Sequence, residues 1–250
     1  MKIFGLTNKY YFLAICLALF GLFLSFSAQA QLNIDSGSIL LATNPNFEYV
    51  ISWRALNYVP ANYKGKVLAT DNSNIEISFD AVNQGKIVDL SKQKVEWRLN
   101  NNIINSGVGL KSIKFTADKS ADQVITITVP NYSDAKYKIG ELNTSTTISL
   151  VPPQLVIKAP YPNRQTTIGE KVFQALPYFF NISNIGQLKI SWEVNGQKIN
   201  NQSASPDIFN ILMATQGQAA EGASVSIKAF AQNITNQLEF AQNYINLNIK

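Results

Sequence analysis

Two segments of the chain share one pattern of apolar and polar residues. In LKISWEVNGQKIN, residues 188–200, apolar side chains occupy every second position from Leu188 to Val194, which is the period of a strand with one buried face. The segment QKVEWRLNNNIIN, residues 93–105, repeats the pattern, so that Trp97 corresponds to Trp192 after 95 residues. One β-sandwich domain has about 100 residues. The repeat therefore predicts an all-β chain of two tandem immunoglobulin-like β-sandwich domains.

Each copy of the repeat continues into a tight turn. Asn195-Gly196 supplies residues that tolerate a positive φ, as a two-residue hairpin requires, and Asn100-Asn101 is a weaker version of the same turn. We expect Trp97 and Trp192 to be core residues of corresponding strands. Trp53, in the alternating segment FEYVISWRA, is expected to be a third core indole.

Short apolar segments separated by turn residues continue along the chain, as expected for sandwich domains. Pro152-Pro153 favours an extended spacer and divides the chain into domains at 47–150 and 151–250, with 31–46 as a tether or lead-in strand. The expected strands lie at 47–55, 75–81, 95–99, 113–115, 125–129, 155–158, 172–181, 188–194, 208–212, 225–231 and 244–249.

The first residues have the composition of an export signal. Lys2 and Lys9 precede an apolar run of about 15 residues, which is short for a membrane span, and a small-x-small site ends at Ala30. We expect residues 1–30 to be a signal peptide that is cleaved after Ala30. The alternative is an uncleaved signal anchor, because Tyr10 and Tyr11 can lengthen the apolar segment at the membrane interface.

Composition limits the chemistry of the exported part. Cleavage would remove two of the 21 basic residues and no acidic one, which leaves 19 against 16 and a net charge of +3, too even to indicate a nucleic-acid partner. The protein has no histidine, and its one cysteine, Cys16, lies in the signal segment. Histidine acid–base catalysis, cysteine nucleophiles and ordinary zinc sites are therefore excluded from the mature chain.

Acidic residues offer the remaining route to catalysis or metal binding. Glu76 and Asp80 share one strand at an even spacing beside polar neighbours, which is typical of a solvated face. Residues 71–76 offer oxygen ligands for calcium but lack the spacing of a known calcium loop, and such residues are also common turn formers. We predict no catalytic residues, no cofactor and no metal site.

Aromatic residues give the candidates for a contact surface. In Tyr178-Phe179-Phe180 three successive aromatic side chains cannot all enter one core, because a strand sends neighbouring side chains to opposite faces. The cluster either covers a loop or the boundary with the first domain, which we favour, or it forms an exposed site for a partner. Tyr58 and Tyr63, beside two lysines, form a second candidate.

The motifs resemble a family of uncharacterised secreted bacterial proteins. A tryptophan followed by a charged residue, an apolar residue and an Asn-led turn is similar to the central hairpin of immunoglobulin-like and PKD-like domains. Together, SWRALNYVPANYKGK, VEWRLNNNIINSGVGLKSIKF, ALPYFFN and ISWEVNGQKIN look like secreted proteins from candidate-phyla bacteria. The likeness covers most of residues 47–250 and implies fold and export. The segment 60–63 departs from the Pro-Pro-aromatic pattern of that family.

These observations predict a non-catalytic module, extracellular or attached to the envelope, for adhesion, surface structure or assembly. The alternative is a carbohydrate-active or peptide-processing enzyme that uses carboxylates alone. The expected partner is an envelope protein or a surface polysaccharide, with no nucleic acid and with membrane contact only through the N-terminal segment.

Overall fold

A computed structural model of the protein describes residues 47–118, 122–133, 138–159, 161–201, 203–213 and 223–250. The predicted signal segment, 1–30, and the predicted lead-in, 31–46, lie outside these residues. Within the described ranges β-strands are the main regular structure, and the only helices are single 3₁₀ turns, η1 at Pro162–Arg164 and η2 at Ile185–Gln187. No helix in this part of the chain is long and apolar enough to cross a membrane.

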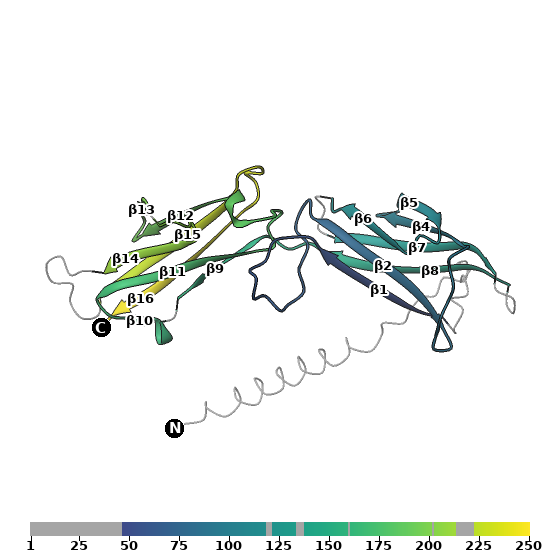
Figure 1. Ribbon diagram of the computed structural model, residues 1–250, viewed down its shortest axis with the longest axis horizontal. Coiled ribbons are helices and arrows are strands. Elements are labelled where there is room, and N and C mark those ends of the chain that lie inside the picture. The colour runs from purple at the N-terminus through teal and green to yellow at the C-terminus, as the bar shows by residue number, and fades with distance from the viewer. Residues whose placement is uncertain (1–46, 119–121, 134–137, 160, 202, 214–222) are drawn as a thin grey trace, which may run out of the picture. The chain divides into compact units, whose positions relative to one another are not determined.

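The first group of strands forms two sheets (Figure 1). In one sheet β2 pairs antiparallel with β1, β3 and β6, and in the other the order is β5-β4-β7-β8. The bounds are β1 Phe47–Ala55, β2 Asn74–Asn83, β3 Lys86–Ile87, β4 Lys94–Leu99, β5 Asn102–Val108, β6 Ser112–Thr116, β7 Asp122–Ser133 and β8 Lys138–Ser149.

The second group begins at Gln154 and also forms two sheets, with the orders β14-β11-β9 and β10-β16-β15-β12-β13. All described pairs are antiparallel except the short parallel pair of β10 with β16. The bounds are β9 Gln154–Lys158, β10 Gln165–Thr166, β11 Gly169–Tyr178, β12 Leu188–Val194, β13 Gln197–Ile199, β14 Ile208–Met213, β15 Ser224–Asn233 and β16 Phe240–Ile249. The all-β class and the two immunoglobulin-like sandwiches are confirmed.

Each sandwich has its own hydrophobic core with one tryptophan from the sequence repeat in it. Trp97 and Trp192 have no exposed surface. The indole N–H of Trp97 donates to the carbonyl of Leu110 at 2.8 Å, and that of Trp192 to the carbonyl of Pro206 at 3.1 Å. The repeat therefore preserves a buried ring together with a backbone partner that satisfies its one polar group.

The hairpin after each tryptophan has the two-residue turn that the sequence predicts. Asn100 and Asn101 have φ of 47° and 70°, and Asn195 and Gly196 have φ of 50° and 79°. In both turns the side chain of the first Asn also accepts a hydrogen bond from the strand on the other side of the hairpin, Asn100 from the N–H of Val124 in β7 at 3.0 Å and Asn195 from that of Ser226 in β15 at 2.9 Å. The shared Asn thus adopts the positive φ and binds the neighbouring strand.

Trp53 lies at the margin of the first core rather than inside it. The Trp53 ring packs against the core but is only half-buried. The reason is that β1 pairs only with β2, so β1 is an edge strand and its inward side chains are covered from one side only. The ammonium of Lys66 sits 3.4 Å from the ring centroid, a cation–π contact.

The segment between β1 and β2 forms backbone hydrogen bonds with the chain after β11. Beyond the end of β11, Tyr58 and Phe180 form an isolated antiparallel bridge. The N–H of Tyr58 donates to the carbonyl of Phe180 at 2.8 Å, and the N–H of Phe179 donates to the carbonyl of Tyr58 at 2.7 Å. The loop that follows β1 in the first sandwich therefore pairs with residues 179–180 of the second sandwich as a neighbouring strand would.

Candidate functional site

The tyrosines selected from the sequence lie together. Tyr63, in the β1–β2 segment, contacts Tyr178 at the end of β11, with ring centroids 5.5 Å apart and planes at 71°. Its ring also meets that of Phe179 edge-on at 5.9 Å. Tyr58 lies in the same segment and packs against the second core. Residues far apart in the sequence thus form one aromatic cluster where the two sandwiches meet.

The three successive aromatic residues are accommodated because the strand ends inside them. The expected strand at 172–181 stops at Tyr178, and Phe179 has a φ of 64°, which is unusual for a bulky residue. The alternation of faces ends there, so Phe179 and Phe180 are both buried while Tyr178 remains half-exposed. Phe180 belongs to the second core, and Phe179 covers the boundary beside Tyr63.

Side-chain amide groups reinforce the boundary. The side-chain amide of Asn57 donates to the carbonyl of Phe179 at 2.9 Å, and that of Asn181 donates to the carbonyl of Asp71 at 2.8 Å and to the hydroxyl of Thr70 at 3.1 Å. The backbone N–H of Asn181 donates to the carboxylate of Glu239 at 2.6 Å. Each sandwich therefore provides hydrogen-bond partners for the other.

A cleft of about 590 Å³ opens beside the aromatic cluster. We call it the tyrosine cleft; Tyr58 and residues 60–65 line it from the first sandwich and residues 174–178 from the second, with Lys158, Ile185 and Asp207 completing it. Its volume falls within the range of roughly 300 to 1,000 Å³ that small-molecule sites occupy. Tyr58, Tyr63 and Tyr178 each present part of a ring to it.

A single buried carboxylate lies in the lining of this cleft. Asp207 is 7% exposed and accepts hydrogen bonds from the amide of Gln174 at 3.1 Å and from the hydroxyl of Ser205. Burial, and secondarily the charge of Asp207, raises the pKa of the Tyr58 phenol. Tyr58 therefore stays protonated, and its hydroxyl faces a local negative charge.

The loop that carries Tyr63 is held by its own hydrogen bonds. The N–H of Tyr63 donates to the carbonyl of Pro60 at 2.9 Å, and its hydroxyl donates to the carbonyl of Lys66 at 3.0 Å. A Cβ at Gly65 would lie only 2.6 Å from Cζ of the Tyr63 ring, so a side chain there would displace the ring. Gly65 thus permits the position that Tyr63 takes in the cleft.

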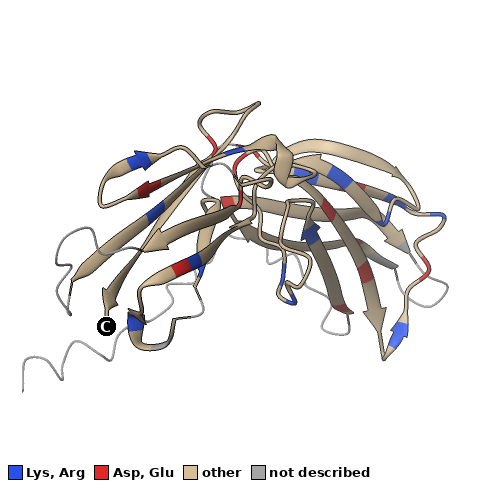
Figure 2. Cartoon of the chain, turned by 60° about the vertical axis from the view of Figure 1, so that its left-hand side comes forward, with Lys and Arg blue, Asp and Glu red and all other residues tan. Residues whose placement is uncertain are grey.

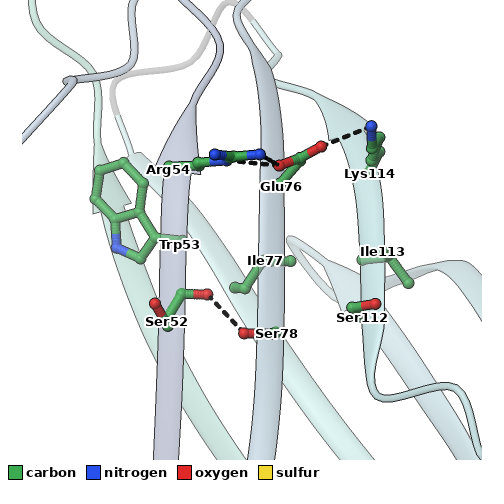
Figure 3. A pocket seen from close by; sticks show the side chains of 9 residues that line it. All are labelled: Ser52, Trp53, Arg54, Glu76, Ile77, Ser78, Ser112, Ile113 and Lys114. Carbon is green, nitrogen blue, oxygen red and sulfur yellow. Dashed lines mark hydrogen bonds and ion pairs between the residues drawn. The ribbon is translucent and has the colours of Figure 1, made fainter.

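A second hollow lies on the outer surface of the β1-β2-β6 sheet (Figure 3). Arg54, Glu76 and Lys114 form a row across the three strands, with Glu76 Oε2 2.5 Å from Arg54 Nη2 and Oε1 2.6 Å from Lys114 Nζ. The next row on the same face consists of three serines, Ser52, Ser78 and Ser112. Their side chains are small, so the surface is hollow there. Its charges are paired with one another, which makes it a weaker site for a ligand.

The acidic groups with clear pKa shifts are not poised as proton donors. Hydrogen bonds from Lys114 and Arg54 lower the pKa of Glu76, Lys94 does the same to Glu96, and hydrogen bonds from Ser91 lower that of Asp89. A general acid at neutral pH needs a raised pKa. The described residues contain no cluster of three or more potential Asp, Glu, His or Cys metal ligands, and their charged positions are dispersed along the strands (Figure 2).

The sequence identifies the aromatic residues of the cleft but not its polar groups. Asp207 and Gln174 meet only through the arrangement of β11 beside the chain before β14, and Lys158 reaches the cleft from β9. The sequence places Asn57 in a loop and Asn181 at the end of the strand expected at 172–181, and it gives neither residue a role at the boundary. Partner binding at Tyr58, Tyr63, Tyr178, Phe179 and Phe180 stays a prediction.

Comparison with known proteins gives similarities of fold alone. No protein-family model matches the chain, and no curated protein matches it. The fibronectin(III)-like modules of CbhA from Clostridium thermocellum are similar, with 15% identity and a TM-score of 0.28 over 80% of this chain and 94% of that one. The three N-terminal domains of the highly immunogenic outer capsid protein of bacteriophage RB49 show 10% identity and a TM-score of 0.40, over 81% of this chain and 59% of that one.

A third similar structure is SGBP-B of a Bacteroides ovatus mixed-linkage glucan utilization locus, solved with a mixed-linkage heptasaccharide. It shows 16% identity and a TM-score of 0.21 over 80% of this chain and 47% of that one. At these TM-scores, the fold assignment follows from the strand pairing of the chain itself.

Proposed function

We propose that this protein is a non-catalytic module, extracellular or attached to the envelope, that acts in adhesion, surface structure or assembly. The export signal expected at residues 1–30 supports the location. The two sandwiches, built without histidine, support a binding or structural role over a catalytic one.

The observation that carries the proposal is that both sandwiches contribute to the tyrosine cleft. The backbone bridge between Tyr58 and Phe180 and the bond from Asn57 to Phe179 hold the two walls together. A spacer needs no such shared cleft, whereas a contact surface with fixed walls loses less conformational entropy on binding.

The charges of the cleft also favour binding over carboxylate catalysis. Glycoside hydrolysis generally uses two carboxyl groups that flank the bond to be broken. The cleft contains one, Asp207, which is already hydrogen-bonded to Gln174 and Ser205.

The proposal is tested in the producing cells. Intact cells should expose the protein to added protease, and the mass of the purified protein shows whether residues 1–30 are removed. Deletion of the gene should weaken surface attachment or alter envelope integrity. A strain in which Tyr178→Ala replaces the wild type should show the same defect although the protein level is unchanged.

Three results would overturn the proposal. The first is retention of the full-length chain in the cytoplasm. The second is identical behaviour of the deletion and wild-type strains in attachment and envelope integrity. The third is turnover of a polysaccharide or peptide by the purified protein that is lost in Asp207→Asn.

A further inference from the structure

The tyrosine cleft combines aromatic surface with side-chain hydrogen-bonding groups. Tyr63 and Tyr178 meet at a steep angle, so that a flat ligand can lie on one ring while the other ring flanks it. Sugar rings have apolar C–H faces that pack on aromatic rings and hydroxyl groups around their edges. Carboxylate, amide and phenol groups, here Asp207, Gln174 and Tyr58, are suitable partners for such hydroxyls.

The rim of the cleft is positively charged. Lys64 and Lys158 are exposed and line the cleft, and among the described residues neither ammonium forms an ion pair or a hydrogen bond. Asp207 is the single acidic side chain in the lining, so the cleft carries a formal charge of +1. An anionic ligand would therefore be attracted, and two ammonium groups remain available to its carboxylates.

The backbone of the cleft offers little to a peptide. Peptides that bind along a sheet need free main-chain donors and acceptors at a strand edge. Here residues 174–178 pair with β9 on one side, and on the other the N–H of Ala175 donates to the carbonyl of Asp207 at 2.8 Å. Pro177 has no N–H, and Phe179 is bonded to Tyr58. Recognition in the cleft thus depends on side chains.

We propose that the tyrosine cleft binds a segment of an acidic polysaccharide, with a sugar ring against Tyr63 and Tyr178 and its carboxylates near Lys64 and Lys158. This inference rests on the proposed function, since such polymers are met outside the cell. It adds a ligand class to the cleft and a role for each wall: the first sandwich provides Tyr63 and Lys64, and the second provides Tyr178 and Lys158.

The test is binding of the exported full chain to immobilised polysaccharides. Polygalacturonate, alginate and hyaluronan serve as acidic probes, and dextran and a mixed-linkage glucan as neutral ones. We expect binding to at least one acidic polymer, weakened by added salt. Tyr178→Ala should raise the Kd about tenfold or more, as removal of a central aromatic contact does.

Two further variants separate ligand binding from folding. Gly65→Ala should displace the Tyr63 ring and weaken binding, whereas Gly107→Ala is a matched control, because a Cβ there makes an ordinary contact of 3.5 Å with Leu110. The double variant Lys64→Gln and Lys158→Gln alters only exposed side chains, so its melting temperature should be unchanged. Its binding to the acidic polymer should depend much less on added salt.

The proposal is overturned if no polysaccharide binds, if only neutral polymers bind, or if the cleft variants bind as the wild type does. A partner in envelope extracts that is destroyed by protease, with no polysaccharide bound, would assign the cleft to a protein instead. Failure of the binding assays leaves surface location and the deletion phenotype intact. The proposed function thus stands or falls separately from this inference.

Discussion

At the scale of single residues, the two repeated tryptophans are the strongest determinants of stability. Replacing Trp97 or Trp192 by Ala should reduce the free energy of unfolding of its own sandwich by about 3–5 kcal/mol, because each ring is fully buried and would leave a cavity. Urea unfolding followed by NMR signals from each sandwich measures the effect. Trp53→Ala is the control and should reduce the free energy of unfolding by less, because that ring is only half-buried. An equal reduction in all three variants would contradict the placement of Trp53 at the margin of the core.

The phenol of Tyr58 offers a second test at this scale. Burial raises its pKa, and the negative charge of Asp207 adds to the shift. Asp207→Asn should therefore move the pKa of Tyr58 down toward the ordinary value of 10.0 without restoring it fully. Phenolate absorbance during an alkaline titration, compared with a Tyr58→Phe variant, isolates this group. If the pKa of Tyr58 did not change in Asp207→Asn, the charge of Asp207 would not act on Tyr58.

At the scale of elements, the charged row on the β1-β2-β6 sheet should respond to pH. Hydrogen bonds from Lys114, then Arg54, lower the pKa of Glu76 from 4.5. A carboxylate with a lowered pKa in the folded state contributes stability above its unfolded pKa and loses that contribution as the pH falls through the folded value. Lys114→Met should raise the pKa of Glu76, which an NMR titration measures. Lys189→Met, in the other sandwich, should leave it unchanged.

The elements also show how far sequence patterns extend. The hairpins at Asn100 and Asn195 could be predicted because the turn chemistry is local. Strand β8, Lys138–Ser149, was missed because Ser and Thr occupy most of its centre and its extended form follows from pairing along β7. The strand expected at 172–181 ended early, since the left-handed conformation of Phe179 is stabilised by bonds to Asn57 and Tyr58, which no local pattern reveals.

The aromatic residues of the cleft could be predicted from the sequence, whereas most of its polar groups could not. The run of three aromatic residues is visible in the sequence, and it predicts that at least one of them needs a partner outside one core. The groups that turn an aromatic cluster into a cleft come from separate segments: Lys158 from β9, Gln174 from β11 and Asp207 from the turn before β14. Their convergence depends on the register of β11 with β9 and β14, which the sequence does not specify locally.

At the scale of the whole molecule, the side-chain amides of Asn57 and Asn181 reinforce the boundary between the sandwiches. Asn57→Ala leaves the carbonyl of Phe179 without its side-chain donor and should weaken the boundary by about 1–3 kcal/mol. Faster hydrogen exchange at the N–H groups of Tyr58 and Phe179, with little change elsewhere in either sandwich, is the expected result. Asn243→Ala is the control, because that amide donates to Leu155 within the second sandwich at 2.8 Å.

The bridge between Tyr58 and Phe180 has a mechanical consequence. The sandwiches are joined covalently through residues 150–153 and non-covalently through this bridge and the side-chain hydrogen bonds of Asn57 and Asn181, so a tensile load that separates the sandwiches must break all of these hydrogen bonds. Phe180 belongs to the second core and Tyr58 packs against it, so breaking the bridge would also uncover part of that core. For a protein tethered at a surface, such a joint would pass a pull from one sandwich to the other through more than the peptide chain alone.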